Sequence, residues 1–170
     1  LVLGTAQSGG VLDLRSGEDT SAINADASGH VTMPKQPAFN VAPSGVQSNI
    51  DNNDIVAFGT EIFDQNADFA SNAFTAPVTG RYLISANVRI DNLDSSGTWF
   101  AISIQTSNRN YTNLNSASTL DTDSGFYFFS ITMLCDLDAN DTANVLFNKS
   151  GGSATGDVST SSYFSGVLVC

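Results

Sequence analysis

Positive charge is scarce in this chain, where six Lys and Arg stand against seventeen Asp and Glu for a formal net charge of −11. Because such a surface repels phosphate backbones, we expect no nucleic-acid partner. No apolar run reaches transmembrane length, so we expect no membrane insertion.

Two cysteines are too few for a disulfide framework. We expect Cys135, which lies inside an apolar run, to be buried. For Cys170 three states remain as alternatives: a free thiol, a disulfide bridge or a contact with a neighbouring subunit.

Catalytic signatures are also missing. The single histidine, His30, has no Ser or Cys nucleophile signal near it, which argues against a Ser-His-acid site. Asp121 and Asp123 are paired carboxylates, but a Thr- and Asp-rich solvated loop explains them better than a glycosidase pair does. We therefore predict that the chain is not an enzyme, and a polysaccharide or ester hydrolase is the least favoured alternative.

The residues that are abundant favour β structure. Eleven Phe and many Ser, Thr and Asn occur without a long helix-forming run. The clearest pattern spans residues 81–91, where apolar residues from Tyr82 to Ile90 alternate with polar ones after a Pro77–Gly80 turn. We predict strands at residues 38–41, 46–50, 55–63, 69–74, 81–91, 98–107, near 111, 125–137, 142–148 and 161–170. About ten short strands indicate an all-β sandwich or barrel.

Residues 1–36 differ in composition from the rest, being rich in Gly, Ser, Ala and Asp. Ser28-Gly29 between residues 23–25 and 31–33 predicts a small hairpin. This segment has too little apolar surface for a core of its own, so it is either a linker or is ordered by neighbouring chains. We predict an extended, shaft-like segment over residues 1–36 and a head over residues 37–170, joined at a stiff Pro34–Pro37 connection.

Two predicted strands are apolar on both faces, namely the start of 125–137 and the final strand from Tyr163 to Val169. A strand in a lone sandwich buries one face, so the second face needs a cover. We interpret this as an oligomer interface added to the core of each subunit. A strand tucked under a loop is the alternative.

The head opens with Pro37-Ala38-Phe39 and ends with Phe164-Ser165-Gly166. Between them the spaced positions are Phe58, Asp64, Phe69, Phe74, Gly80 and Tyr82. Together these residues resemble the complement C1q-like globular head, a relative of the tumour necrosis factor jelly roll, over roughly residues 37–170. Three departures are a short Phe69–Phe74 gap, Ile84 and Ala86 where the family prefers aromatics, and no collagen-type glycine repeat.

The resemblance implies a jelly-roll β-sandwich that forms a homotrimer. We expect the trimer interface to contain Tyr82, Phe126, Phe128, Tyr163, Val167 and Val169. Three copies of a chain with charge −11 would then repel one another, which a bound cation would relieve. Asp136, Asp138 and Asp141 supply hard oxygen ligands around a turn and suit calcium, with a plain turn as the alternative. No other cofactor is expected.

The stretch Ser28-Gly29-His30-Val31-Thr32-Met33-Pro34 resembles the joint between shaft and head in bacteriophage fibre-like virion proteins. This implies a virion structural and adhesion protein, with other virion proteins bound through the N-terminal segment and a host-surface glycan or protein as the target. Arg109 and Tyr111 are the expected ligand contacts, since an exposed Tyr can stack on a sugar. The alternative is a secreted, extracellular C1q-like ligand or pattern-recognition module, in which the Asn110, Asn140 and Asn148 sequons would carry glycans.

Overall fold

The computed structural model describes residues 12–15, 21–120 and 122–170. The chain divides into two compact units, Leu1–Gln36 and Pro37–Cys170. Each unit is described by itself below.

The N-terminal unit contains a small antiparallel sheet in the order β1 (Leu12–Arg15), β2 (Ser21–Ala25) and β3 (Val31–Thr32). A tight turn joins β2 to β3, and its Gly29 has a φ of +84°, which favours glycine. The Asp26 carboxylate accepts hydrogen bonds from the backbone N–H groups of Ser28 and His30, at 2.8 and 2.9 Å. The hairpin predicted at Ser28-Gly29 is therefore confirmed.

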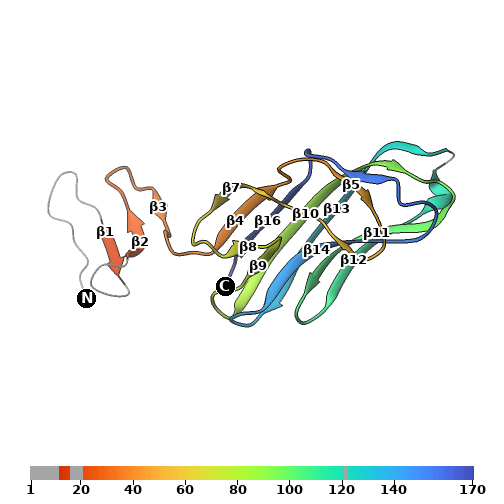
Figure 1. Cartoon of the computed structure of the whole chain (residues 1–170). Coiled ribbons are helices and arrows are strands. Elements are labelled where there is room, and N and C mark those ends of the chain that lie inside the picture. Colours follow the sequence, from red (N-terminus) through yellow and green to blue (C-terminus); the bar gives the residue numbers. More distant parts are fainter. Residues whose placement is uncertain (1–11, 16–20, 121) are drawn as a thin grey trace. The chain divides into compact units, whose positions relative to one another are not determined.

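The head consists of antiparallel strands in two sheets (Figure 1). Sheet I contains β4 (Ala38–Ala42), β5 (Gln47–Ile50), β7 (Thr60–Asp64), β10 (Gly80–Leu93), β13 (Ser124–Leu137), β15 (Gly156–Val158) and β16 (Tyr163–Leu168). Sheet II contains β6 (Asp54–Ile55), β8 (Phe69–Ala70), β9 (Ala73–Thr75), β11 (Gly97–Thr106), β12 (Asn110–Ser116) and β14 (Thr142–Gly151). The all-β fold class is confirmed.

The long strand β10 organises sheet I. One of its edges pairs with β13, from Gly80 opposite Leu137 to Leu93 opposite Ser124. The other edge pairs first with β16 and then with β15. The orange β4 and the dark blue β16 lie side by side, so the first and last strands of the head are neighbours (Figure 1).

The core lies between the two sheets. On β10 every second side chain from Tyr82 to Ile90 is buried, as the alternation predicted. An aromatic cluster from different strands fills one end, with the rings of Phe39 and Phe74 stacked at 4.7 Å between centroids. Gly166 of β16 passes so close that a Cβ there would lie 2.6 Å from both the Phe39 and Ile84 side chains. A larger residue at this crossing would require the Phe39 or Ile84 side chain to shift.

Two strand predictions are wrong in extent. Residues 55–63 do not form one strand, because β6 pairs in sheet II and β7 in sheet I, and the chain crosses between the sheets at residues 56–59. Residues 69–74 form a tight hairpin of β8 and β9, turned by Ser71 and Asn72 at φ values of 51° and 64°. The short strand β15 was not predicted, since Gly156–Val158 is too short for a visible alternation.

Helix is almost absent from the described ranges, where the only helical element is the 3-10 turn Ala117–Thr119. Within those same ranges no helix has the length and apolarity needed to cross a membrane.

Candidate interaction surface

The face of sheet I that points away from the core is the candidate site, and we call it the outer face. Across this face the register aligns Leu134 of β13, Leu83 of β10, Val167 of β16 and Ala38 of β4 in one row. The three larger side chains are 53%, 42% and 38% exposed, in that order. We call these four residues the apolar row. It is uncharged and crosses four strands.

A polar row runs beside the apolar row. It contains Thr132, Ser85, Ser165 and Asn40, and ends at Phe63 of β7. The Ser85 and Thr132 hydroxyls are hydrogen-bonded at 2.8 Å. The Asn40 Oδ1 atom is buried, yet the described residues offer it no hydrogen-bond donor. A buried acceptor without a partner costs free energy in the folded subunit.

The two rows border an open hollow of about 390 Å³, lined by Ala38, Phe39, Asn40, Phe63, Leu83, Ser85, Ser165, Gly166 and Val167. The lining is mostly apolar, and the side chains of Phe63 and Leu83 at its rim are exposed. Its mostly apolar lining suits an apolar side chain from another molecule.

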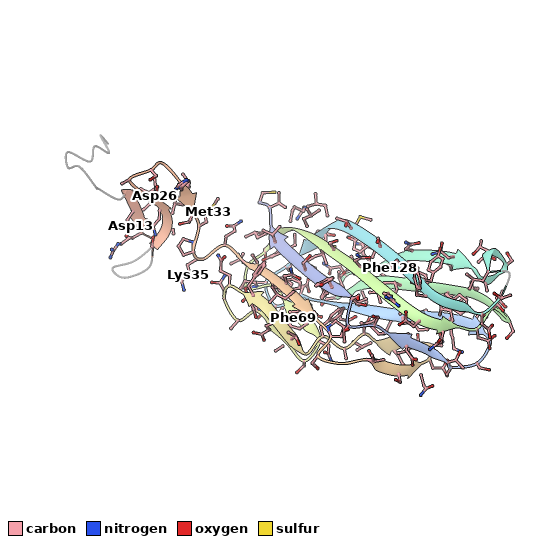
Figure 2. All side chains as sticks on the ribbon, turned by 90° about the horizontal axis from the view of Figure 1, so that it is seen from above. Asp13, Asp26, Met33, Lys35, Phe69 and Phe128 are labelled. Carbon is pink, nitrogen blue, oxygen red and sulfur yellow. The ribbon has the colours of Figure 1, made fainter. Side chains whose placement is uncertain are left out.

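The remainder of the outer face carries aromatic residues. Phe126 and Phe128 lie on β13 with ring centroids 6.3 Å apart, and both are exposed. Phe128, labelled on the head in Figure 2, is 46% exposed. The guanidinium of Arg89 lies 4.8 Å from the centre of the Phe126 ring, and its Nε donates to Asp91 at 2.7 Å. Exposed Tyr163 lies on β16 on the same face.

The five predicted interface residues Phe126, Phe128, Tyr163, Val167 and Val169 all expose their side chains in the isolated subunit. Their contact with another subunit stays a prediction. Tyr82 is different, because it is completely buried in the core and its hydroxyl donates to the Val78 carbonyl at 2.7 Å. Burial raises the pKa of the Tyr82 phenol. Tyr82 occupies an inward position of β10, so its assignment to the interface surface is wrong.

Sequence reasoning missed Leu83, Leu134 and Phe63. A signal existed for Leu83, which is the one large apolar residue among the outward positions of β10, between Arg81 and Ser85. Such an interruption of the polar alternation indicates an outward face that needs cover. No comparable signal identifies which residues of other strands lie beside it, because that depends on register.

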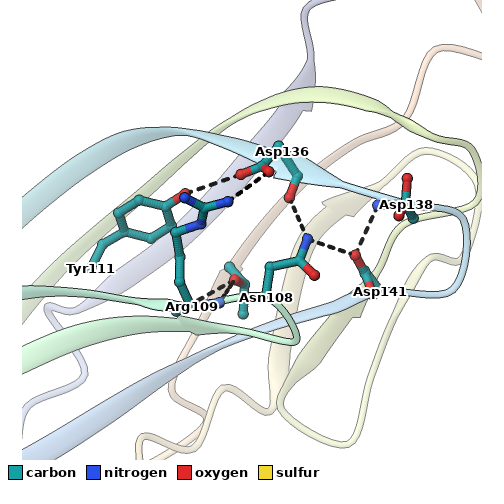
Figure 3. Close-up of polar contacts among 7 residues, drawn as sticks. Asn108, Arg109, Tyr111, Asp136, Asp138 and Asp141 are labelled. Atoms are coloured by element: carbon teal, nitrogen blue, oxygen red, sulfur yellow. Dashed lines mark hydrogen bonds and ion pairs between the residues drawn. The ribbon is translucent and has the colours of Figure 1, made fainter.

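The expected ligand contacts lie at another part of the head (Figure 3). Arg109 Nη2 donates to Asp136 Oδ2 at 2.8 Å, and the Tyr111 hydroxyl donates to Asp136 Oδ1 at a long 3.4 Å. Burial raises the pKa of the half-buried Tyr111. These side chains therefore hold the turn between β11 and β12 against the end of β13. The Arg109 side chain is still half exposed, so its role in ligand contact stays a prediction.

The carboxylates proposed for calcium already have partners within the head. Asp141 Oδ2 accepts from Asn108 Nδ2 at 2.9 Å and from the Asp138 N–H at 2.8 Å, while Asp136 pairs with Arg109 (Figure 3). In residues 12–15, 21–120 and 122–170, no group of three His, Cys, Asp or Glu side chains is placed to hold a metal ion. The arrangement is that of a hydrogen-bonded turn, and the calcium site stays a prediction.

The residues weighed for catalysis also have structural partners. Asp123 Oδ1 accepts from both the N–H and the hydroxyl of Ser95 at 2.9 Å, which ties two loops together. Asp121 lies outside the described residues. His30 Nδ1 lies 2.9 Å from the Asp26 carboxylate within the N-terminal hairpin.

Both cysteines are free thiols. Cys135 is completely buried, as predicted, and burial raises the pKa of its thiol to about 11. Cys170 is exposed at the end of the chain.

Comparison with known proteins agrees with this geometry. A family model for the C1q domain matches residues 38–169. No curated protein matches the chain in sequence. Among solved structures, the globular domain of zebrafish complement 1qA protein has a TM-score of 0.60 at 18% identity, covering 79% of this chain and 98% of that one. Murine APRIL at pH 8.5 has a TM-score of 0.56 at 12% identity, covering 79% and 100%. At these identities the likeness shows the jelly-roll fold alone.

Proposed function

Because the chain belongs to the C1q domain family, we propose that residues 37–170 form a homotrimeric recognition head through the outer face of sheet I. Domains of this family typically form homotrimers and are generally non-enzymatic. The observation that carries the proposal is the apolar row of Leu134, Leu83, Val167 and Ala38, which is exposed in the isolated subunit. Contiguous exposed apolar surface of this kind marks an interaction site.

The strongly negative charge of the chain also favours the outer face of sheet I as the surface through which copies associate. The chain has a net charge of −11, so two copies repel each other over most approaches. The apolar row is uncharged, and the adjacent polar row contains only neutral side chains. A neighbouring subunit that covers these rows buries apolar area, which favours association.

The trimer would act by avidity. Three identical heads present three identical sets of loops, so a weak contact at each head becomes a strong one when all three engage a surface. The turn that carries Arg109 and Tyr111 is the proposed contact region, because Arg109 is half exposed and held in place by Asp136.

The proposed setting is a virion, in which the head displays its loops to a host-surface glycan or protein. The support is the small sheet of the N-terminal unit, in which none of the described side chains is buried, and which therefore suits attachment to other virion proteins. Family members are typically extracellular. A secreted ligand or pattern-recognition module is the second candidate, favoured by the exposure of Asn110 and Asn140 at two sequons.

Light scattering of the full chain tests the proposal. We expect the mass of three chains, and a stable monomer at micromolar concentration would contradict it.

Fractionation of the source material then separates the two settings. Sedimentation of the protein with particles supports the virion, whereas recovery in the medium with an endoglycosidase-sensitive mass supports the secreted ligand.

A further inference from the structure

The small sheet of the N-terminal unit has one apolar face. Its register places Leu14 directly opposite Ile23, and Ala25 opposite Val31. Successive side chains of a strand point to opposite faces, so these four residues share one face, which we call the apolar sheet face. Leu14 and Ile23 are each 37% exposed, and Val31 is 61% exposed.

The opposite face is polar and hydrogen-bonded within itself. Asp13 accepts from Arg15 Nε at 2.6 Å and from the Ser21 hydroxyl at 2.5 Å. Asn24 and Thr32 lie on the same side, because Asp13, Asn24 and Thr32 are register partners. The sheet therefore has one face suited to water and one that is not.

None of the described side chains of β1, β2 and β3 is buried, so these strands form no core of their own. A sheet without a core usually needs a disulfide, a metal or association with other chains. Both cysteines lie in the head, so a disulfide within residues 1–36 is excluded. A three-stranded sheet with one apolar face becomes stable when that face is packed against something.

We propose that the apolar sheet face packs against the same face of neighbouring copies of this chain, so that the N-terminal units form a second subunit interface. This inference rests on the proposed trimer. Like faces can meet here because the apolar sheet face carries no charge, whereas the chain as a whole is strongly acidic.

The short connection between the two units makes neighbouring copies of this unit the favoured partner for the apolar sheet face. Five residues connect the end of β3 at Thr32 to the start of β4 at Ala38. Ala38 belongs to the apolar row of the proposed head interface, because it pairs with Val167. A connection of this length spans at most about 18 Å, so a head trimer confines three sheets to a small volume at high effective concentration. Along the chain, the proposed interface of the N-terminal units is thus followed directly by the proposed interface of the heads.

The test is face-specific disulfide cross-linking in the full chain. Cys170 is replaced by Ser, and Cys135 is buried with a raised pKa, so neither competes. Ile23→Cys on the apolar sheet face is compared with Asn24→Cys on the opposite face, and Val31→Cys with Thr32→Cys as a second pair in case one variant perturbs the sheet. Native mass is measured on the same samples before oxidation.

We expect Ile23→Cys and Val31→Cys to form intersubunit disulfides at least about tenfold faster than their controls, joining two of the three chains. Equal rates on both faces, or no cross-link in a sample that is trimeric, would overturn this inference and leave the head trimer standing. A monomeric native mass would overturn the head trimer as well, so the two failures are distinguishable.

Discussion

Leu83 of β10 lies directly opposite Leu134 of β13 on the outer face of sheet I, and both leucines remain exposed although their strands pair along their whole length. On the other side of Leu83 lies Val167 of β16. Backbone pairing thus leaves three apolar side chains aligned in water. This relationship accounts for the proposed subunit contact more directly than the aromatic residues near the start of β13.

Replacing Leu83 with Asp should convert the trimer to monomers. An unpaired carboxylate buried in an interface costs about 3–5 kcal/mol, which weakens association by at least about 100-fold. Light scattering over a dilution series measures this directly. The matched control is Leu114→Asp, since Leu114 is also an exposed leucine but lies on β12 of sheet II. A trimer that survives in Leu83→Asp, or dissociation in both variants, would contradict the placement of the interface.

Replacing Gly166 with Ala should destabilise the head. The added Cβ would lie 2.6 Å from Phe39 Cε1 and Ile84 Cδ1, and both of these side chains are buried, so they would have to shift. Overpacking of this kind costs about 1–3 kcal/mol. Urea unfolding followed by fluorescence gives the free energy of unfolding. Gly45→Ala is the control, because a Cβ at Gly45 meets nothing within 4 Å. An unchanged free energy in Gly166→Ala would show that the crossing can relax.

Thiol labelling should distinguish the two cysteines. Cys170 is exposed, whereas Cys135 is buried and its thiol has a pKa of about 11. Since the thiolate is the reactive form, we expect one thiol per chain to react with an aromatic disulfide reagent at pH 8, and two after unfolding in urea. Cys170→Ser should abolish the fast reaction. Two reactive thiols in the native protein would mean that the core near β13 opens readily.

The stability of the head should fall in acid partly through Asp94. Its carboxylate accepts hydrogen bonds from the backbone N–H groups of Ser153 at 2.6 Å and Ser96 at 2.9 Å, which lowers its pKa in the folded state below the ordinary value of 3.8. A lowered folded pKa stabilises the fold above pH 3.8, and that contribution is lost as the pH falls through the folded pKa.

Asp94→Asn should therefore lower the urea midpoint at pH 7 and flatten its decline below pH 4. Glu61→Gln on the exposed strand β7 removes the same formal charge and serves as the control. If Asp94→Asn retains the full acid dependence of the parent protein, the loop contacts of Asp94 do not contribute to it.

Chelation should leave the native mass unchanged. Asp136 already pairs with Arg109, and Asp141 accepts from Asn108 and from the Asp138 N–H, so the Asp136 and Asp141 carboxylates already have partners within the protein. Light scattering and thermal unfolding with calcium, and again with a chelator, measure the effect. A trimer that dissociates in chelator and reforms with calcium would establish the site predicted at Asp136, Asp138 and Asp141.

The fold was largely predictable because its signals are local. The alternation over residues 81–91 identified the inward face of β10, and the Ser28-Gly29 turn identified the N-terminal hairpin. The strand prediction failed where residues that are close in sequence pair in different sheets. Residues 55–63 were merged into one strand because nothing in their composition marks the crossing from sheet II to sheet I.

The exposed aromatic side chains of the outer face were predictable as well, since Phe126 and Phe128 stand out in a strand that is apolar on both faces. Tyr82 was wrongly assigned to the interface because the aromatic residue type alone does not indicate which face of a strand it occupies. Its position in the alternation of β10 places it on the inward face. Leu83 was overlooked although it is the one large apolar residue among the outward positions of β10. Leu134 was overlooked because its place beside Leu83 depends on strand register.

The sequence by itself determined the β class, the boundary near residue 37 between a segment poor in apolar residues and a head, and the inward face of β10. These follow from composition and from the two-residue period of a strand, which are properties of neighbouring residues. Only the tertiary structure decided that Leu134, Leu83, Val167 and Ala38 form one row. Strand register depends on pairing between residues far apart in the chain, and no local pattern encodes it.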